Sequence, residues 1–345
     1  GGGFFRYTVD PGWETPHYEK MLYTQALLAS LYLRAADLLN EPRYREVAAD
    51  TLDFVLQQMR GDGGAYIASL SAVDAEGNEG GSYLWSEAQL KRLLSGDQLR
   101  LALQHWRFTF GEQLPGQALP HAGEPLATMA KAHGVSLRQL GISVEQIRAK
   151  LLNQRASRLP PRDLKQLAAW NGLLLTALSE AAQQLRRDDY RQAAAELAAW
   201  LQTLWDGQRL ARSSLEGTAT GSASLADYAY VAQGLKSWGE LAGDQQLLQI
   251  SKQLTAAAWK RFYSDKGWRL GDEMLIPGIA GKPLLADGPM PSPAAVLMAL
   301  GDEHSGGQFA RALRISVDGV LRSPLWNAGH LWQLFVAQQS RENTE

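Results

Sequence analysis

The chain has 345 residues, and its 34 Lys and Arg nearly balance its 36 Asp and Glu, which argues against a general nucleic-acid-binding protein. Apolar residues make up 45% of the chain, as in globular proteins, and no apolar run reaches the roughly 18–20 residues that span a bilayer. The absence of cysteine excludes disulfides and thiolate chemistry within the chain.

Helical periodicity dominates the sequence. Over 16–39 the apolar residues recur at three- and four-residue spacing, and Pro16 suits the first turn of a helix. Turns that contain Gly, Asp or Pro separate this segment from its successors. The predicted helices span 16–39, 42–60, 166–186, 189–205, 224–242 and 245–263.

Paired helices of this kind predict a repeated helical hairpin. The hairpins cover 16–60, 86–156, 166–205, 224–263 and about 293–322, and one more helix follows over about 325–339. Short aromatic segments after the hairpins, at Tyr66, Leu210 and Trp268, are expected to form small β-hairpins. Long and short links alternate, which favours a closed ring over an open solenoid.

We therefore expect an all-α fold, an (α/α)6-like toroid that lacks its first hairpin and carries short β-hairpins in its loops. The chain starts at Gly1 without Met, which suggests that the missing hairpin lies upstream. The expected organisation is a single toroid domain over 1–345, with an irregular insertion at about 107–140.

The densest group of reactive side chains lies at 13–23 and includes Trp13, His17, Glu19, Lys20 and Tyr23. In the predicted helix, His17 occupies the first turn, Lys20 follows three residues later, and Glu19 pairs with Tyr23. A helix N-terminus disfavours imidazolium, so His17 is expected to be neutral and able to accept a proton. The alternative is that these residues are ordinary first-turn charges and packing groups.

Further polar groups stand in loops and at helix starts. Asp74 and Glu76 lie in a glycine-rich loop before Trp85, where they supply an acid/base pair or a cation site, or form a solvated turn. Trp170, Asn171, Asp227, Tyr228 and Asp287 lie at or before the starts of first helices, where they line a shared pocket or act as caps and core residues. The six histidines are scattered, P-loop, dinucleotide and zinc-protease signatures are absent, and we expect no metal and no cofactor.

Several of these motifs occur in the order of a known family. They are GGGF-x-RY at 1–7, W-x-x-PHYEKMLY at 13–23, EG-x-EG-x-x-Y-x-W at 76–85, WNGL at 170–173, DYA at 227–229 and DG-x-x-PS at 287–292. On these motifs the chain resembles the C-terminal portion of the thioredoxin-domain-containing, spermatogenesis-associated protein family. The resemblance implies an upstream thioredoxin-like domain and a toroid similar to N-acylglucosamine 2-epimerases and six-hairpin glycosidases.

The chain departs from the family pattern at positions expected to line the mouth of the toroid. The family's His after GGGF is Phe5, an Asp of its acidic loop is Ala72, and the Glu before DYA is Ala226. The acidic segment before WNGL reads Asp163-Leu164-Lys165, and the family's P-S-G-N-S reads 291–295, Pro-Ser-Pro-Ala-Ala. Proton transfer requires polar groups within hydrogen-bonding reach of a substrate, so these changes count against catalysis.

Two functions stay open. The first is a sugar 2-epimerase or aldose–ketose isomerase, in which His17 is the base, Glu19 orients it, and Arg6 or Lys20 stabilises the enediolate oxygen. The second is a non-catalytic toroid with a degenerate site that binds a ligand or a protein. A glycoside hydrolase that uses Asp74 or Glu76 with Asp227 is less favoured.

The predicted catalytic residues are His17, Glu19, Lys20 and Asp227. The predicted substrate-binding residues are Arg6, Tyr7, Trp13, Tyr23, Asp74, Glu76, Trp85, Trp170, Asn171, Tyr228 and Asp287. The expected ligand is sugar-like, with no nucleic acid and no membrane as partner. Contact with an upstream thioredoxin-like domain, or self-association through the helical face left open, is also expected, and the chain is expected to be cytoplasmic.

Overall fold

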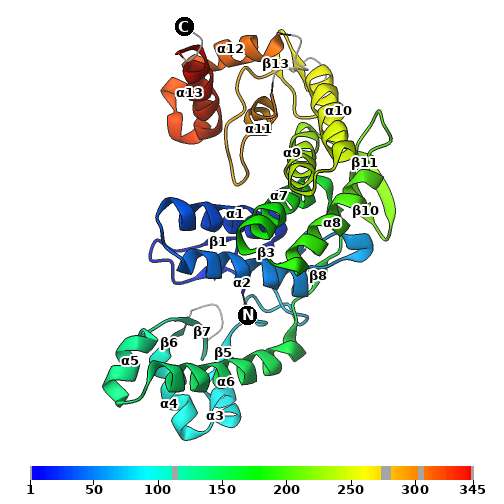
Figure 1. Ribbon diagram of the computed structural model, residues 1–345. Helices are drawn as coiled ribbons and strands as arrows, with labels where there is room; N and C mark the ends of the chain where they lie inside the picture. The colour runs from blue at the N-terminus through cyan, green and yellow to red at the C-terminus, as the bar shows by residue number, and fades with distance from the viewer. Residues whose placement is uncertain (1, 111–115, 273–280, 302–306, 343–345) are drawn as a thin grey trace. The chain divides into compact units, whose positions relative to one another are not determined.

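The computed structural model describes residues 2–110, 116–272, 281–301 and 307–342. Most of these residues lie in α-helices, with short strands between them (Figure 1), which confirms the expected class of paired helices with short β-hairpins. The chain divides into two compact units. The first unit holds Gly3–Met21 and Ser69–Asp163, and the second holds Leu22–Ala68 and Leu164–Glu345. A single domain over 1–345 stays a prediction.

The second unit is a row of helical hairpins. Its helices are α1 (Leu22–Leu38), α2 (Arg43–Gln58), α7 (Ala168–Leu185), α8 (Asp188–Thr203), α9 (Leu225–Ala242), α10 (Gln245–Phe262), α11 (Pro293–Ala299), α12 (Gln308–Arg322) and α13 (Ala328–Glu342). Helices α1 and α2, α7 and α8, and α9 and α10 form the hairpins, and α1, α7, α9, α11 and α13 pack side by side in that order. The predicted helices that correspond to α2, α7, α8, α9 and α10 are confirmed to within two residues at each end.

Short antiparallel pairs follow the helices of the second unit, as predicted. Tyr66 bridges to Arg60, Leu210 to Trp205, and Trp268 to Lys282. The strands are β9 (Gln166–Leu167), β10 (Ala211–Leu215) and β11 (Thr218–Ser222) in the order β11-β10-β9, and β12 (Tyr263–Ser264) with β13 (Gly267–Trp268).

The first unit combines small sheets with helices. Its sheets are β1 (Tyr7–Thr8) with β2 (Pro16–His17), then β3 (Lys20–Met21), β4 (Ser69–Leu70) and β8 (Arg162–Asp163), and finally β5 (Trp85–Ser86), β7 (Gln117–Ala122) and β6 (Trp106–Phe110). Its helices are α3 (Glu87–Leu93), α4 (Gly96–His105), α5 (Leu126–His133) and α6 (Leu137–Arg155). The stretch 107–140, expected to be irregular, therefore carries regular elements on both sides of 111–115, which lie outside the described residues.

The helix expected to begin at Pro16 begins at Leu22 instead. Pro16–His17 pair with β1 and Lys20–Met21 pair with β4, so the segment 16–21 is extended. The prediction of its helical start was wrong because pairing with distant strands outweighs local helical periodicity over six residues. Among the described residues, no helix is both long and apolar enough to cross a membrane.

Helices α7 and α9 approach each other backbone to backbone. A methyl group added at Gly172 would lie 2.6 Å from the carbonyl carbon of Tyr230, and one added at Gly234 would lie 2.5 Å from the Gly172 oxygen. Distances this short leave no space for a side chain, so the spacing of the two helices requires glycine at both positions.

We expect Gly172→Ala to lower the free energy of unfolding by about 2–3 kcal/mol, because the added methyl collides with backbone atoms that cannot rotate away. Gly141→Ala is the control, since Gly141 lies inside α6 with no atom within 4 Å of the added methyl. That variant should gain about 0.5–1 kcal/mol from higher helix propensity. Chemical denaturation of both variants measures the difference, and a harmless Gly172→Ala would contradict the close approach.

Candidate functional site

A pocket of about 520 Å3 lies within the first unit and collects several of the predicted residues. We call it the His17 pocket, and it is lined by Arg6, His17, Glu19, Ser69, Ser71, Ala72, Val73, Pro161, Arg162 and Asp163. Alternation along extended chain explains part of this set, because side chains two residues apart face the same side. His17 and Glu19 are such a pair, as are Ser69 and Ser71.

The charges of the His17 pocket nearly cancel. Arg6 donates from Nη1 to Glu19 Oε2 at 3.0 Å, and its backbone N–H donates to the Glu19 carbonyl at 2.9 Å. Arg162 and Asp163 add one more charge of each sign. A pocket with balanced charges and serine hydroxyls suits a neutral, hydroxyl-rich ligand better than a polyanion.

His17 is the one imidazole in the lining of this pocket. Its ring stacks on Tyr7, with centroids 4.8 Å apart and planes 12° apart, which fixes its orientation. Its Nδ1 is buried and has no hydrogen-bond partner among the described residues. A buried polar atom without a partner is unfavourable, so a water or a ligand group that reached this nitrogen would be stabilised by it.

Lys20 lies in β3, the strand that follows β2, and does not line the His17 pocket. It is 3% exposed, donates from Nζ to the Gly3 carbonyl at 3.0 Å, and lies 4.7 Å and 5.1 Å from the ring centroids of Phe5 and Tyr83. Burial, and then the nearby charge of Arg155, lower its pKa to about 7. The structure therefore separates Lys20 from His17 and Glu19.

The remaining predicted residues of the first unit lie elsewhere in it. Trp13 is 79% exposed in a turn with φ of 60°. Asp74 and Glu76 line a different cavity of about 290 Å3, where Asp74 Oδ1 accepts from the backbone N–H of Glu76 and closes its own loop. Trp85 is buried beneath the Arg158 guanidinium, 4.4 Å from its ring centroid. These residues are not brought together with His17.

In the second unit, two predicted residues have structural contacts at the start of α7. Asn171 is fully buried, and its side-chain amide accepts from the Tyr66 N–H at 2.9 Å and donates to the Tyr66 carbonyl at 3.0 Å. Trp170 packs edge-on against Tyr23, with centroids 5.0 Å apart. Asn171 thus holds the segment after α2 against α7.

The predicted carboxylates of the second unit bind backbone N–H groups. Asp227 accepts from Ala169 N at 3.1 Å and from Ser224 N at 2.7 Å, so it joins the starts of α7 and α9. Burial raises its pKa, although these hydrogen bonds oppose the shift. The neighbouring Tyr228 hydroxyl accepts from Leu210 N at 3.1 Å.

Asp287 has a similar role near the C-terminal helices. It accepts from Ser292 N at 2.7 Å and from Gly329 N at 2.9 Å, which ties the starts of α11 and α13 together. Together, these contacts favour the cap and core interpretation of the helix-start residues.

Some residues that line the His17 pocket were not predicted from the sequence. Ser69, Ser71 and Arg162 reach the His17 pocket only because β4 pairs with both β3 and β8, which are far apart in the sequence. Such long-range pairing has no local sequence signal. Asp163 is the exception, since it stands where the resembled family carries an acidic segment.

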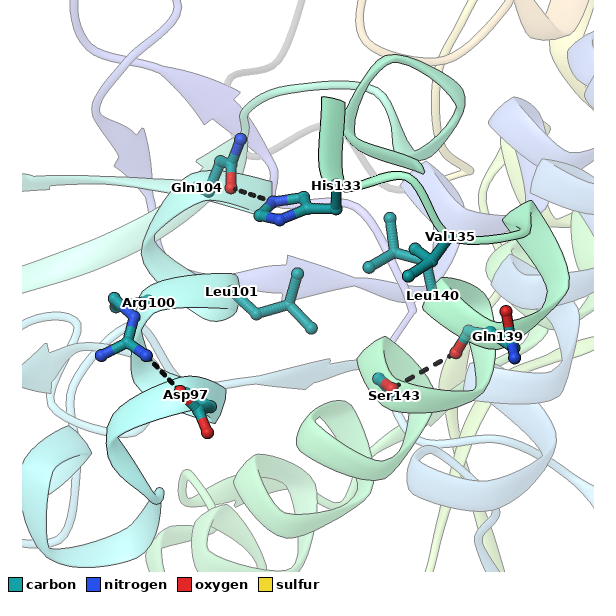
Figure 2. Close-up of a pocket in the computed structure, with 9 residues that line it drawn as sticks. All are labelled: Asp97, Arg100, Leu101, Gln104, His133, Val135, Gln139, Leu140 and Ser143. Carbon is teal, nitrogen blue, oxygen red and sulfur yellow. Dashed lines mark hydrogen bonds and ion pairs between the residues drawn. The ribbon is translucent and has the colours of Figure 1, made fainter. Parts of the chain in front are cut away.

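A second pocket of about 440 Å3 lies between α4, α5 and α6 and was also not predicted. Figure 2 shows its three polar pairs, His133 with Gln104, Asp97 with Arg100, and Ser143 with Gln139, around apolar side chains such as Leu101. His133 Nε2 lies 2.9 Å from Gln104 Oε1, so this histidine already has a partner. The His17 pocket, with its unpartnered imidazole and serine hydroxyls, is therefore the stronger candidate.

Sequence relatives agree with the resemblance found from the motifs. No protein-family model matches the chain. Similar sequences include spermatogenesis-associated protein 20 of Homo sapiens, 28% identical over 307 residues, and of Mus musculus, 27% identical over 306 residues. Each match covers 77% of this chain and 38% of the relative, so the chain spans about two fifths of the length of these relatives.

Similar solved structures include sugar epimerases. The cellobiose 2-epimerase of Spirochaeta thermophila is 13% identical, with a TM-score of 0.44 over 93% of this chain and 78% of that one. A sugar epimerase from a ruminal bacterium is 11% identical, with a TM-score of 0.43 over 92% of this chain and 80% of that one. These similarities concern the fold and assign no role to any residue.

The lowered pKa of Lys20 makes stability depend on pH. The unfolded chain restores this pKa to about 10.5, so between pH 7 and 10.5 the unfolded chain binds more protons and the free energy of unfolding rises with pH. We expect Lys20→Met to abolish this rise, so that the wild type gains about 2 kcal/mol relative to the variant between pH 7 and 9.

Urea denaturation at each pH provides the measurement. Lys91→Met is the matched control, because Lys91 on α3 is 59% exposed and should leave the pH slope unchanged. Equal slopes for the wild type and Lys20→Met would contradict the lowered pKa.

Proposed function

We propose that this homologue of spermatogenesis-associated protein 20 binds a sugar in the His17 pocket and transfers a proton next to the sugar's carbonyl group, as an epimerase or aldose–ketose isomerase does. The observation that carries the proposal is the convergence of His17, Glu19 and Arg6 on one pocket, with His17 Nδ1 lacking a partner among the described residues. The pocket's balanced charges and hydroxyl groups also suit a sugar.

In this mechanism His17 removes the proton from the carbon beside the carbonyl and returns it to a neighbouring position or to the opposite face. The carbonyl oxygen gains negative charge as the enediolate forms, and the guanidinium of Arg6 stabilises it. Glu19 is ion-paired with Arg6 at 3.0 Å, so we assign it to positioning Arg6 instead of His17.

A non-catalytic binding protein is the second candidate, and Ala72 favours it. This residue lines the His17 pocket at the position where the resembled family carries Asp. Phe5, where the family has His, packs edge-on against Tyr83 with centroids 5.0 Å apart. The pocket therefore retains the groups for binding and has lost one acidic group that catalysis elsewhere in the family could use.

Deuterium exchange separates the two candidates. The wild type, His17→Ala and Glu19→Gln are each incubated in D2O with one of three sugars: D-mannose, D-fructose or cellobiose. NMR then measures the deuterium incorporated at the carbon beside the carbonyl. We expect His17→Ala to slow incorporation about 100- to 10,000-fold, the range for loss of a general base. Glu19→Gln should have a smaller effect, because it leaves the proton acceptor in place.

His133→Ala is the matched control, since it removes a histidine from the other pocket of the same unit. Thermal shift with the same sugars measures binding separately from exchange. A thermal shift without deuterium incorporation in the wild type would favour the binding protein, and incorporation that survives His17→Ala would exclude His17 as the base.

A further inference from the structure

A small pocket of the first unit lies between helix α6 and the sheet β5-β7-β6. We call it the Trp85 pocket. Its volume is about 160 Å3, and it is lined by Trp85, Trp106, Pro120, Arg148, Leu151, Leu152 and Arg155. Trp85 was predicted from the sequence to bind substrate, and the structure places it in this pocket, outside the His17 pocket.

Strand pairing explains the aromatic wall of the Trp85 pocket. Trp85 pairs with Ala118, and Pro120, two residues further along the same strand, pairs with Phe108. Partners across an antiparallel pair share a face of the sheet, and so do residues two apart on one strand. Trp85, Trp106 and Pro120 therefore point to one side of the sheet. Residues of α6 pack in one core cluster with Trp85, so this helix covers that side.

Two arginines of α6 supply the polar groups. Arg148 and Arg155 stand two helical turns apart, so they lie along the same side of the helix. The Arg148 side chain is 40% exposed and its Nη1 is ion-paired with Glu145 at 3.2 Å. Arg155 is half-buried with its guanidinium carbon 5.7 Å from the Tyr83 ring centroid, and it has no ion pair or hydrogen bond with any described residue. Arg155 is therefore available to a ligand.

The surroundings of the pocket are positively charged. Burial, and then the charge of Arg155, lower the pKa of both Lys20 and Arg158. The Arg158 guanidinium also lies over the ring of Trp85, 4.4 Å from its centroid. No Asp or Glu is among the described residues that line the pocket. Because a guanidinium keeps its proton at neutral pH, this positive charge persists and favours an anion.

The walls and the volume indicate the rest of the ligand. Five of the seven lining residues are apolar, and ligand pockets typically combine apolar walls with a few polar groups. An apolar cavity of about 150 Å3 holds one benzene molecule, so the Trp85 pocket has room for a single ring. Indole rings form favourable contacts with another flat ring. A guanidinium binds a planar carboxylate through two parallel hydrogen bonds.

We propose that the Trp85 pocket binds a small carboxylate that carries one apolar ring. The ring packs against Trp85 and Trp106, and the carboxylate accepts hydrogen bonds from the guanidinium of Arg155. This site is independent of the sugar chemistry proposed above, because the His17 pocket shares no lining residue with it and has nearly balanced charges.

Calorimetric titration of the full 345-residue chain tests the proposal with three probes. Benzoate has both the ring and the charge, benzamide has the ring without the charge, and acetate has the charge without the ring. We expect benzoate to bind at least about 10-fold more tightly than either of the others, because charge-assisted hydrogen bonds are about twice as strong as neutral ones. Absence of benzoate binding, or equal affinities for benzoate and benzamide, would overturn the proposal.

Substitution of Arg155 locates the site. We expect Arg155→Gln to raise the dissociation constant of benzoate about 10-fold or more and to remove the preference for benzoate over benzamide. Arg138→Gln is the matched control, because Arg138 is an exposed arginine of the same helix outside the pocket lining. The control should bind both probes like the wild type. Circular dichroism checks that each variant is folded.

A second variant tests the pocket without changing its charge. Leu152→Trp adds a large side chain to the lining and keeps both arginines, so it should abolish benzoate binding. Wild-type preference for benzoate in Arg155→Gln, or wild-type affinity in Leu152→Trp, would overturn the proposal because the anion would then bind elsewhere. Equal weakening by Arg138→Gln and Arg155→Gln would also overturn it, because it would indicate a general effect of positive charge.

Discussion

The antiparallel pairing of residues 16–21 decides which side chains can meet in the first unit. Tyr7 of β1 pairs with His17, and Leu70 of β4 pairs with Lys20. Once these pairs hold the backbone extended, alternate side chains must point to opposite faces. The His17 pocket and the buried environment of Lys20 are both consequences of this alternation.

The same residues would group differently on a helix. A 3.6-residue period places His17 beside Lys20, whereas the two-residue period places His17 beside Glu19. The sequence predicted that this segment contributes to a site, and His17 and Glu19 do line one pocket, but which residues group together depended on the backbone. Local periodicity over six residues cannot distinguish a helix from a strand. The strand β4, whose pairing makes this segment extended, lies far along the chain.

The hairpins of the second unit were predictable for the opposite reason. Helices α1, α2 and α7 to α10 are 16–18 residues long, and the loops that follow α2, α8 and α10 contain Gly and Asp. Asp244, for example, caps α10 through the backbone N–H groups of Gln246 and Leu247. The roles of Asn171 and Asp227 were not predictable, because a buried amide or carboxylate that binds distant backbone looks the same in sequence as one that faces a ligand.

The contact between α7 and α9 has a mechanical consequence. Most helix pairs meet through side chains, which can change rotamer and absorb small shifts in spacing. At Gly172 and Gly234 the peptide groups themselves touch, and peptide groups have no such freedom. The contact between α7 and α9 is therefore nearly incompressible. Heat or pressure should loosen the packing of the neighbouring helices before it changes the distance between α7 and α9.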